Sequence, residues 1–194
     1  MGRRSKNNRT FVMIDCETMG LNPARSPLLS VGAVAYTYGK GILLQDEWKL
    51  HFDEQIDIGR KPNGNTLEWW LGQSDAARKS LKGIANGSSL EFLERSLKEF
   101  WETVKTCHNV AQDDMYVVGN GANFDIALID GLLDNRAPWK YTNVCCFRTW
   151  GLDYDDLIDW HLKLPGQVPH SALSDAEWQA TIHLNLMDSV PRLR

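Results

Sequence analysis

Four carboxylates and one imidazole stand at positions from which a folded chain could bring them to one metal site. They are Asp15, Glu17, Asp125, His170 and Asp175. Asp15 and Glu17 are separated by one residue after the apolar run 11–14, so both side chains can leave a strand end on the same side. Because sites in open α/β sheets gather where strands end and helices begin, we expect these segments to converge.

Carboxylates held this close repel one another unless cations compensate their charge. Oxygen ligands suit Mg²⁺ or Mn²⁺, whereas zinc usually recruits more His or Cys. Two such ions about 3.5–4 Å apart can hold the attacking and the leaving oxygen of a phosphodiester. His170 could then take a proton from the attacking water. The residue types therefore favour metal-assisted hydrolysis.

The elements that must position these residues begin with strands. Apolar, β-branched runs predict strands over residues 11–14 and 28–36, and a third around residues 47–52, after the turn at residues 39–41. These three strands should form an antiparallel meander.

Helical spacing of apolar residues dominates the rest of the chain. Helices are expected over residues 66–79, 90–104, 125–133 and 173–187. Short apolar runs predict two further strands, over residues 115–118 and 141–144. Strands followed by strand and helix alternation indicate an α/β domain with a mixed sheet.

The 194 residues are enough for one compact domain, expected over residues 11–194 after a basic flexible tail at residues 1–10. With a formal net charge of −4, the chain lacks a global field that attracts polyanions. No apolar run is long enough to span a membrane. The four cysteines lack zinc-site spacing, so we expect reduced thiols and a cytoplasmic location.

Three segments together resemble the motifs of the DEDDh family of 3′–5′ exonucleases. They are Asp-Cys-Glu-Thr at residues 15–18, Asn-Phe-Asp at 123–125 and His-Ser-Ala-Leu-Ser-Asp at 170–175. The resemblance runs from Phe11 to about Met187. The stretch Thr-Leu-Glu-Trp-Trp at 66–70, with Gln73, Ala76 and Arg78, is similar to a branch containing phage exonuclease A and small bacterial 3′–5′ exoribonucleases. A phage-encoded member would act in the host cytoplasm.

The resemblance implies a ribonuclease H-like fold, a five-stranded mixed sheet with its first three strands antiparallel and flanked by helices. It also implies release of nucleoside 5′-monophosphates from the 3′ ends of single-stranded DNA or RNA, with two Mg²⁺ or Mn²⁺ ions. Asp15 would bridge both ions, Glu17 and Asp175 would complete the first site, and Asp125 would serve the second. His170 would be the general base.

Substrate contacts are expected around the terminal nucleotide. The resemblance assigns them to a backbone amide near the end of the first strand and to apolar side chains that press on the base. The candidate residues are Thr18, Met19, Gly20, Leu21, Asn123, Phe124, Trp70 and Gln73. Adjacent Trp69 and Trp70 cannot share one helix face, so one should pack inward, and stacking, core filling and a subunit interface stay open for the pair.

Two other functions fit the same motifs. The chain could be a nucleic-acid-binding, proofreading-like subunit that needs a partner for turnover. It could also be an oligoribonuclease restricted to short oligonucleotides. The family and the eight tryptophans allow a homodimer, and no membrane partner is expected.

Overall fold

A five-stranded sheet in the order β3-β2-β1-β4-β5 organises the protein. The structure is a computed structural model that describes residues 9–190, so most of the predicted basic tail lies outside the described residues. The strands are β1 (Thr10–Thr18), β2 (Leu28–Thr37), β3 (Gly41–Lys49), β4 (Met115–Gly119) and β5 (Val144–Cys146). Thr10, expected in the tail, is the first residue of β1.

The strand directions make the sheet mixed. β1 pairs with β2 and β2 with β3 in antiparallel register, while β1 pairs with β4 and β4 with β5 in parallel. The predicted ribonuclease H-like sheet, with its first three strands antiparallel, is therefore confirmed.

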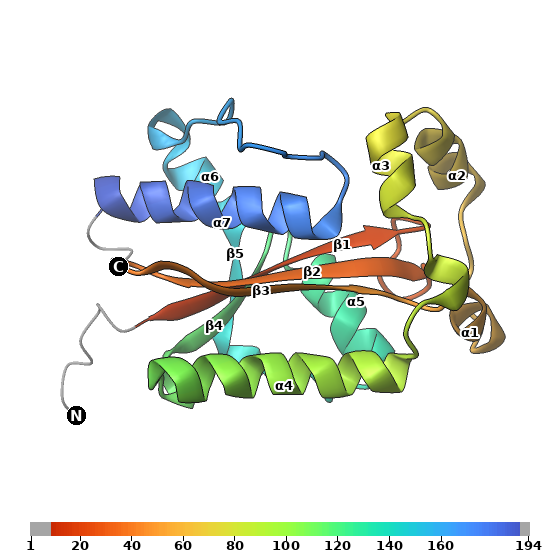
Figure 1. Cartoon of the computed structure of the whole chain (residues 1–194), viewed down its shortest axis with the longest axis horizontal. Coiled ribbons are helices and arrows are strands. Elements are labelled where there is room, and N and C mark those ends of the chain that lie inside the picture. Colours follow the sequence, from red (N-terminus) through yellow and green to blue (C-terminus); the bar gives the residue numbers. More distant parts are fainter. Residues whose placement is uncertain (1–8, 191–194) are drawn as a thin grey trace.

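Helices cover both faces of the sheet (Figure 1). They are α1 (Phe52–Asp57), α2 (Gly64–Leu71), α3 (Asp75–Ser80), α4 (Leu90–His108), α5 (Asp125–Leu132), α6 (Phe147–Asp153) and α7 (Ala172–Ser189). Figure 1 shows α7 on one face, α4 on the other, and α2 with α3 beyond the end of β1. Short 3₁₀ turns lie at Ile84–Asn86, Gln112–Asp114, Tyr141–Asn143 and Asp155–Leu157.

Alternation along β1 divides the core into two layers. Val12 and Ile14 belong to the cluster shared with α4 and α5, whereas Phe11 and Met13 belong to the cluster shared with α7. Successive strand residues point to opposite faces. Odd-numbered positions of β1 therefore face α7, and this parity governs where the acids of the same strand point.

Helix α4 shows how closely the sequence specified some elements. Leu93, Leu97 and Val104 are buried on one side of it, as their spacing predicts. The Ser89 side chain caps its start by accepting a hydrogen bond from the amide of Phe92, and left-handed Asn109 ends it.

Several predicted boundaries were wrong. The third strand runs over Gly41–Lys49 instead of residues 47–52, because it continues directly from the hairpin turn. The single helix expected over residues 66–79 is two helices, because the chain turns at Gly72 and the Ser74 side chain caps a new start. The strand expected at residues 141–144 begins only at Val144, and helices α1 and α6 were not predicted.

Among residues 9–190, no helix is both long enough and apolar enough to cross a membrane. The four cysteines are free, and Cys16 alone among them is buried.

Candidate active site

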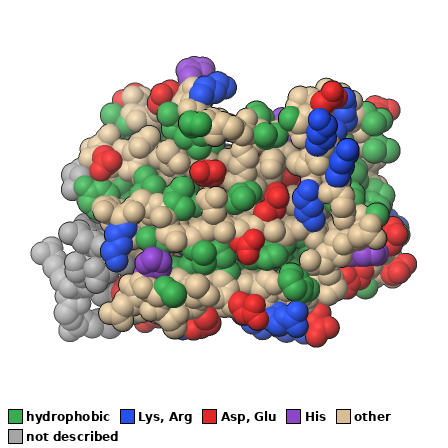
Figure 2. Space-filling model, viewed as in Figure 1, with side chains coloured by type: hydrophobic (Ala, Val, Ile, Leu, Met, Phe, Trp, Pro, Cys, Tyr) green, Lys and Arg blue, Asp and Glu red, His purple; other side chains and the backbone are tan. Residues whose placement is uncertain are grey.

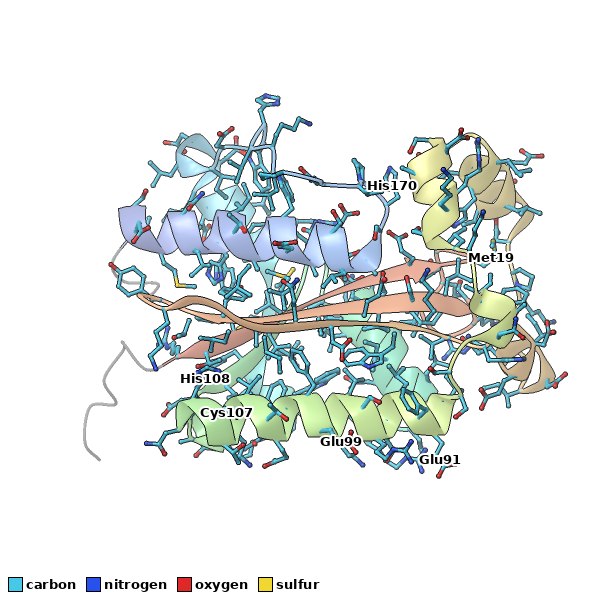
Figure 3. The ribbon with its side chains drawn as sticks, viewed as in Figure 1. Met19, Glu91, Glu99, Cys107, His108 and His170 are labelled. Atoms are coloured by element: carbon cyan, nitrogen blue, oxygen red, sulfur yellow. The ribbon has the colours of Figure 1, made fainter. Side chains whose placement is uncertain are left out.

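The structure brings together all five residues expected to perform chemistry. Asp15 and Glu17 continue the α7-facing side of β1, Asp125 is the first residue of α5, and the last two stand at the start of α7. Ligand atoms of Glu17, His170 and Asp175 lie within 4.8 Å of one another. Figure 3 shows His170 on the chain entering α7, facing the side of the molecule that carries α3.

A glycine allows the start of α7 to approach the sheet. Gly32 lies directly opposite Asp15 in the antiparallel pair of β1 and β2. A β-carbon on Gly32 would collide with the backbone of Ala172 and Leu173. The absence of a side chain therefore lets α7 deliver Asp175 to the strand that carries Asp15.

Gln179 fixes the orientation of Asp15. Its Nε2 donates a hydrogen bond of 2.8 Å to Oδ1 of Asp15. Gln179 is almost fully buried and lies one helical turn beyond Asp175, on the same face of α7. The helix that supplies Asp175 therefore also holds the Asp15 side chain in place, through Gln179.

Asp125 is anchored to the neighbouring strand. The backbone amide of Cys16 donates a hydrogen bond of 3.2 Å to Oδ1 of Asp125. The preceding turn contains Gly121 at φ 118°, a conformation that strongly favours glycine. The Arg148 guanidinium lies over this turn and donates to the carbonyl of Asn120 at 2.9 Å.

The backbone of His170 is held in an unusual conformation. Its φ is 63°, which is uncommon for a residue with a side chain. The His170 amide donates to Oδ2 of Asp175 at 2.8 Å, and its carbonyl accepts from the hydroxyl of Ser80 in α3 at 3.2 Å. The imidazole meets the ring of Trp69 edge to face, with centroids 4.8 Å apart. Contacts from three helices, α2, α3 and α7, thus hold the histidine in place.

The electrostatics of the cluster favour bound cations. Burial, followed by repulsion from Asp175 and Asp125, raises the pKa of Glu17 to about 8. Burial raises the pKa of Asp125 to about 7, although the Cys16 amide and Arg148 act in the opposite direction. Burial also raises the pKa of Asp15, where repulsion from the other three acids adds to it, and the pKa of Asp175.

A divalent metal fits this donor set. Carboxylate oxygens predominate, which suits hard cations. Burial, followed by repulsion between the acids, raises the pKa of Asp15 and Glu17, and a bound cation would offset both effects by favouring the ionised carboxylates. The described residues thus offer a metal site in which Glu17, His170 and Asp175 have their ligand atoms closest together.

A cavity of about 510 Å³ opens beside the cluster. It is mainly apolar and large enough for a nucleotide. Of the expected substrate contacts, Thr18, Leu21, Phe124 and Trp70 line it. The other lining residues are Cys16, Glu17, Asn63, Asn65, Thr66 and Trp69.

The two tryptophans have different positions. Trp70 is the tryptophan that packs inward, and it is 3% exposed. Its indole Nε1 donates a hydrogen bond to the carbonyl of Thr18 at 3.0 Å. Trp70 therefore supports the wall of the cavity and stabilises the end of β1. Trp69 is 44% exposed and contacts the His170 ring. The sequence had put Trp70 among the substrate contacts, whereas Trp69 offers more surface to a ligand.

The other expected substrate contacts do not line the cavity. Asn123 and Gln73 do not line the cavity, and the Gln73 side chain instead donates to the carbonyl of Trp69 at 3.0 Å. The Met19 amide already donates to the carbonyl of Pro27 at 2.9 Å, so this amide is engaged within the protein. The Met19 side chain packs in a small core with Trp70, and Gly20 is pressed against Ser26.

The family model for the Rv2179c-like 3′–5′ exoribonuclease domain matches residues 10–187. The chain belongs to this family. Membership of a 3′–5′ exoribonuclease family confirms the exonuclease class that the motifs predicted, while the phage branch stays a prediction. None of the curated proteins matches the sequence.

Solved structures of exonuclease I share the fold of this exonuclease domain. One that suggests how processivity is achieved is 14% identical, with a TM-score of 0.59 over 95% of this chain and 42% of that one. The zinc-bound Escherichia coli complex with single-stranded DNA is 15% identical, with a TM-score of 0.62 over 96% and 42%. The complex with a dA16 oligonucleotide is 14% identical, with a TM-score of 0.60 over 95% and 42%. The exonuclease domain thus spans less than half the length of these neighbours.

Two residues and one contact of this exonuclease domain were not predicted from the sequence. Gln179 could have been found from its position four residues after Asp175, on the same helix face. Gly32 could have been found as a lone glycine inside a strand, which often marks a close backbone approach. The contact of Trp69 with His170 had no signal, because these residues are far apart in the sequence.

Proposed function

We propose that residues 10–187 act as a single exonuclease domain that removes nucleotides from the 3′ ends of single-stranded DNA or RNA and releases nucleoside 5′-monophosphates. The observation that carries the proposal is the group Glu17, His170 and Asp175, with ligand atoms within 4.8 Å of one another beside a cavity of nucleotide size. Membership of a 3′–5′ exoribonuclease family supports the direction of cleavage.

Asp15, Glu17 and Asp175 would hold one Mg²⁺ or Mn²⁺ ion, and Asp125 would help Asp15 to hold a second. Bound there, the two ions would supply positive charge to the attacking and leaving oxygens of the phosphodiester. Gln179 keeps Asp15 turned toward the other acids.

His170 is the proposed general base. Its imidazole is half-buried beside Glu17 and Asp175. In this position it can accept a proton from the attacking water. Trp69 limits rotation of the ring by its edge-to-face contact. In the cavity, Phe124, Leu21 and Trp69 would surround the terminal base.

The test is product analysis on 5′-labelled single strands of DNA and RNA with the same sequence, in Mg²⁺, Mn²⁺ or EDTA. A ladder that shortens from the 3′ end, requires metal and is lost in Asp15→Ala supports the proposal and reports the preferred sugar. No shortening of either strand by a folded protein contradicts it and favours the subunit that needs a partner or the oligoribonuclease restricted to short oligonucleotides. The homodimer stays a prediction, which sedimentation measures.

A further inference from the structure

Three lysines lie along the α3 side of the proposed active site. Lys79 and Lys82 flank Ser80, the residue whose hydroxyl bonds the carbonyl of His170. Lys49 is the last residue of β3. We call Lys49, Lys79 and Lys82 the lysine strip, and Figure 2 shows Lys and Arg side chains gathered over this part of the surface.

The sheet register puts Lys49 on the same face as the catalytic acids. Glu17 pairs with Ser30 on β2, and Ser30 pairs with Lys49 on β3. Directly opposed residues in antiparallel strands point to the same face, and neighbouring strands are about 4.8 Å apart. The backbone of Lys49 is therefore about 10 Å from that of Glu17.

The strip carries uncompensated positive charge. Lys49 Nζ donates to the carbonyl of Lys82 at 3.0 Å, which draws the Lys49 ammonium toward the chain that carries Lys82. Within residues 9–190, none of the three lysines has a carboxylate within ion-pair distance, whereas Arg78 is paired with Asp75. Lys79 and Lys82 are exposed to solvent.

This local charge stands out against the rest of the molecule. The chain has a net charge of −4, and its proposed active site concentrates four acids. A nucleic-acid strand would be repelled by such a surface unless cations met its phosphates. A strip of unpaired lysines next to the acids meets that need.

We propose that the lysine strip binds backbone phosphates of the strand upstream of the terminal nucleotide. The inference rests on the exonuclease function proposed above and adds a preference for strands long enough to reach α3. Lysine contacts to phosphate carry no base information, so the preference concerns length and not sequence.

The experiment compares a long single strand with a dinucleotide, which cannot reach beyond the active site. The variant is Lys79→Glu with Lys82→Glu, and both changed residues lie outside the proposed catalytic groups. We expect KM for the long strand to rise about tenfold or more at low salt, with a shallower salt dependence. The kinetics on the dinucleotide should not change.

The matched control is Lys40→Glu with Arg95→Glu, which gives the same net charge at the hairpin between β2 and β3 and on α4, across the sheet. Within residues 9–190, neither side chain has a carboxylate within ion-pair distance. The inference is overturned if the control raises KM for the long strand equally, or if the strip variant leaves that KM unchanged. It is also overturned if the dinucleotide is affected to the same degree.

Failure of the exonuclease function itself would have a different signature. The wild-type protein would then cleave neither substrate. Fluorescence anisotropy of a labelled long strand in EDTA would still test the strip: weaker binding by the strip variant than by the control supports it, and equal binding overturns it.

Discussion

The backbone of Ala172, where α7 begins, packs against the α-carbon of Gly32 in the middle of β2. This contact sets the distance between the helix that carries Asp175 and the strand that carries Asp15. We therefore expect Gly32→Ala to displace the start of α7 and lower kcat at least tenfold. Overpacking should also reduce the free energy of unfolding by about 1–3 kcal/mol. Steady-state kinetics and denaturant unfolding measure the two effects.

Gly64→Ala is the control for this substitution, because Gly64 lies at the first position of α2 and a β-carbon there would meet no neighbouring atom within 4 Å. It should leave both quantities nearly unchanged. Normal turnover in Gly32→Ala would show that the approach of α7 does not govern the site.

The stability of the metal-free protein should fall as pH rises. The pKa of Glu17 is raised from 4.5 to about 8, and that of Asp125 from 3.8 to about 7. Between the unfolded and folded pKa values, the folded state keeps protons that the unfolded chain has released, so each unit of pH in this window costs stability. We expect the thermal midpoint in EDTA to decline from about pH 4.5 to about pH 8.

Divalent metal should oppose this decline, because it binds the ionised carboxylates of the folded state alone. The stabilisation by Mg²⁺ or Mn²⁺ should therefore grow with pH over the same window. Scanning calorimetry with and without metal measures it. A midpoint in EDTA that rises with pH would contradict the raised pKa values of Glu17 and Asp125.

Removing the proposed general base should slow the reaction without unfolding the protein. We expect His170→Ala to lower kcat by about 10²–10⁴-fold at neutral pH, with little change in KM. His161→Ala is the matched control, because His161 is exposed on the chain that leads to the site. A full-rate His170→Ala variant would exclude this imidazole from proton transfer.

Loss of the amide that orients Asp15 should weaken metal binding. Gln179→Ala removes the donor at 2.8 Å from Oδ1 of Asp15. Partners that orient metal ligands typically change affinity by about 10–100-fold, so we expect the Mn²⁺ affinity to fall by at least tenfold. Calorimetric titration measures it, with exposed Asn185→Ala on the same helix as control. Unchanged Mn²⁺ affinity would reduce Gln179 to a packing residue.

Several features of this protein could be predicted from local sequence. The continuous apolar run in β1 reflects burial on both faces of the sheet, and the helical period in α4 and α7 records which face of each helix is buried, because burial imposes these patterns on the residues themselves. The motif acids lie in such elements or at their start, and His170 stands just before one, so their approach to one another could be expected from the order of strands and helices.

Other features depend on contacts between distant segments. The sequence required one of two adjacent tryptophans to turn inward, but only the carbonyl of Thr18, at the end of β1, selected Trp70. The break between α2 and α3, by contrast, is a local feature: the Ser74 side chain caps α3, and the apolar spacing of the segment concealed it.

The sequence by itself determined the fold class, the five residues expected to perform chemistry and the amphipathic faces of the long helices, because periodicity and motif order are properties of the chain. The tertiary structure alone decided that Gln179 holds Asp15, that Trp69 contacts His170 and that Lys49 shares a face with Glu17. Each of these relationships joins segments through the packing of α7, α2 or β3, and such long-range packing leaves no repeat in the sequence.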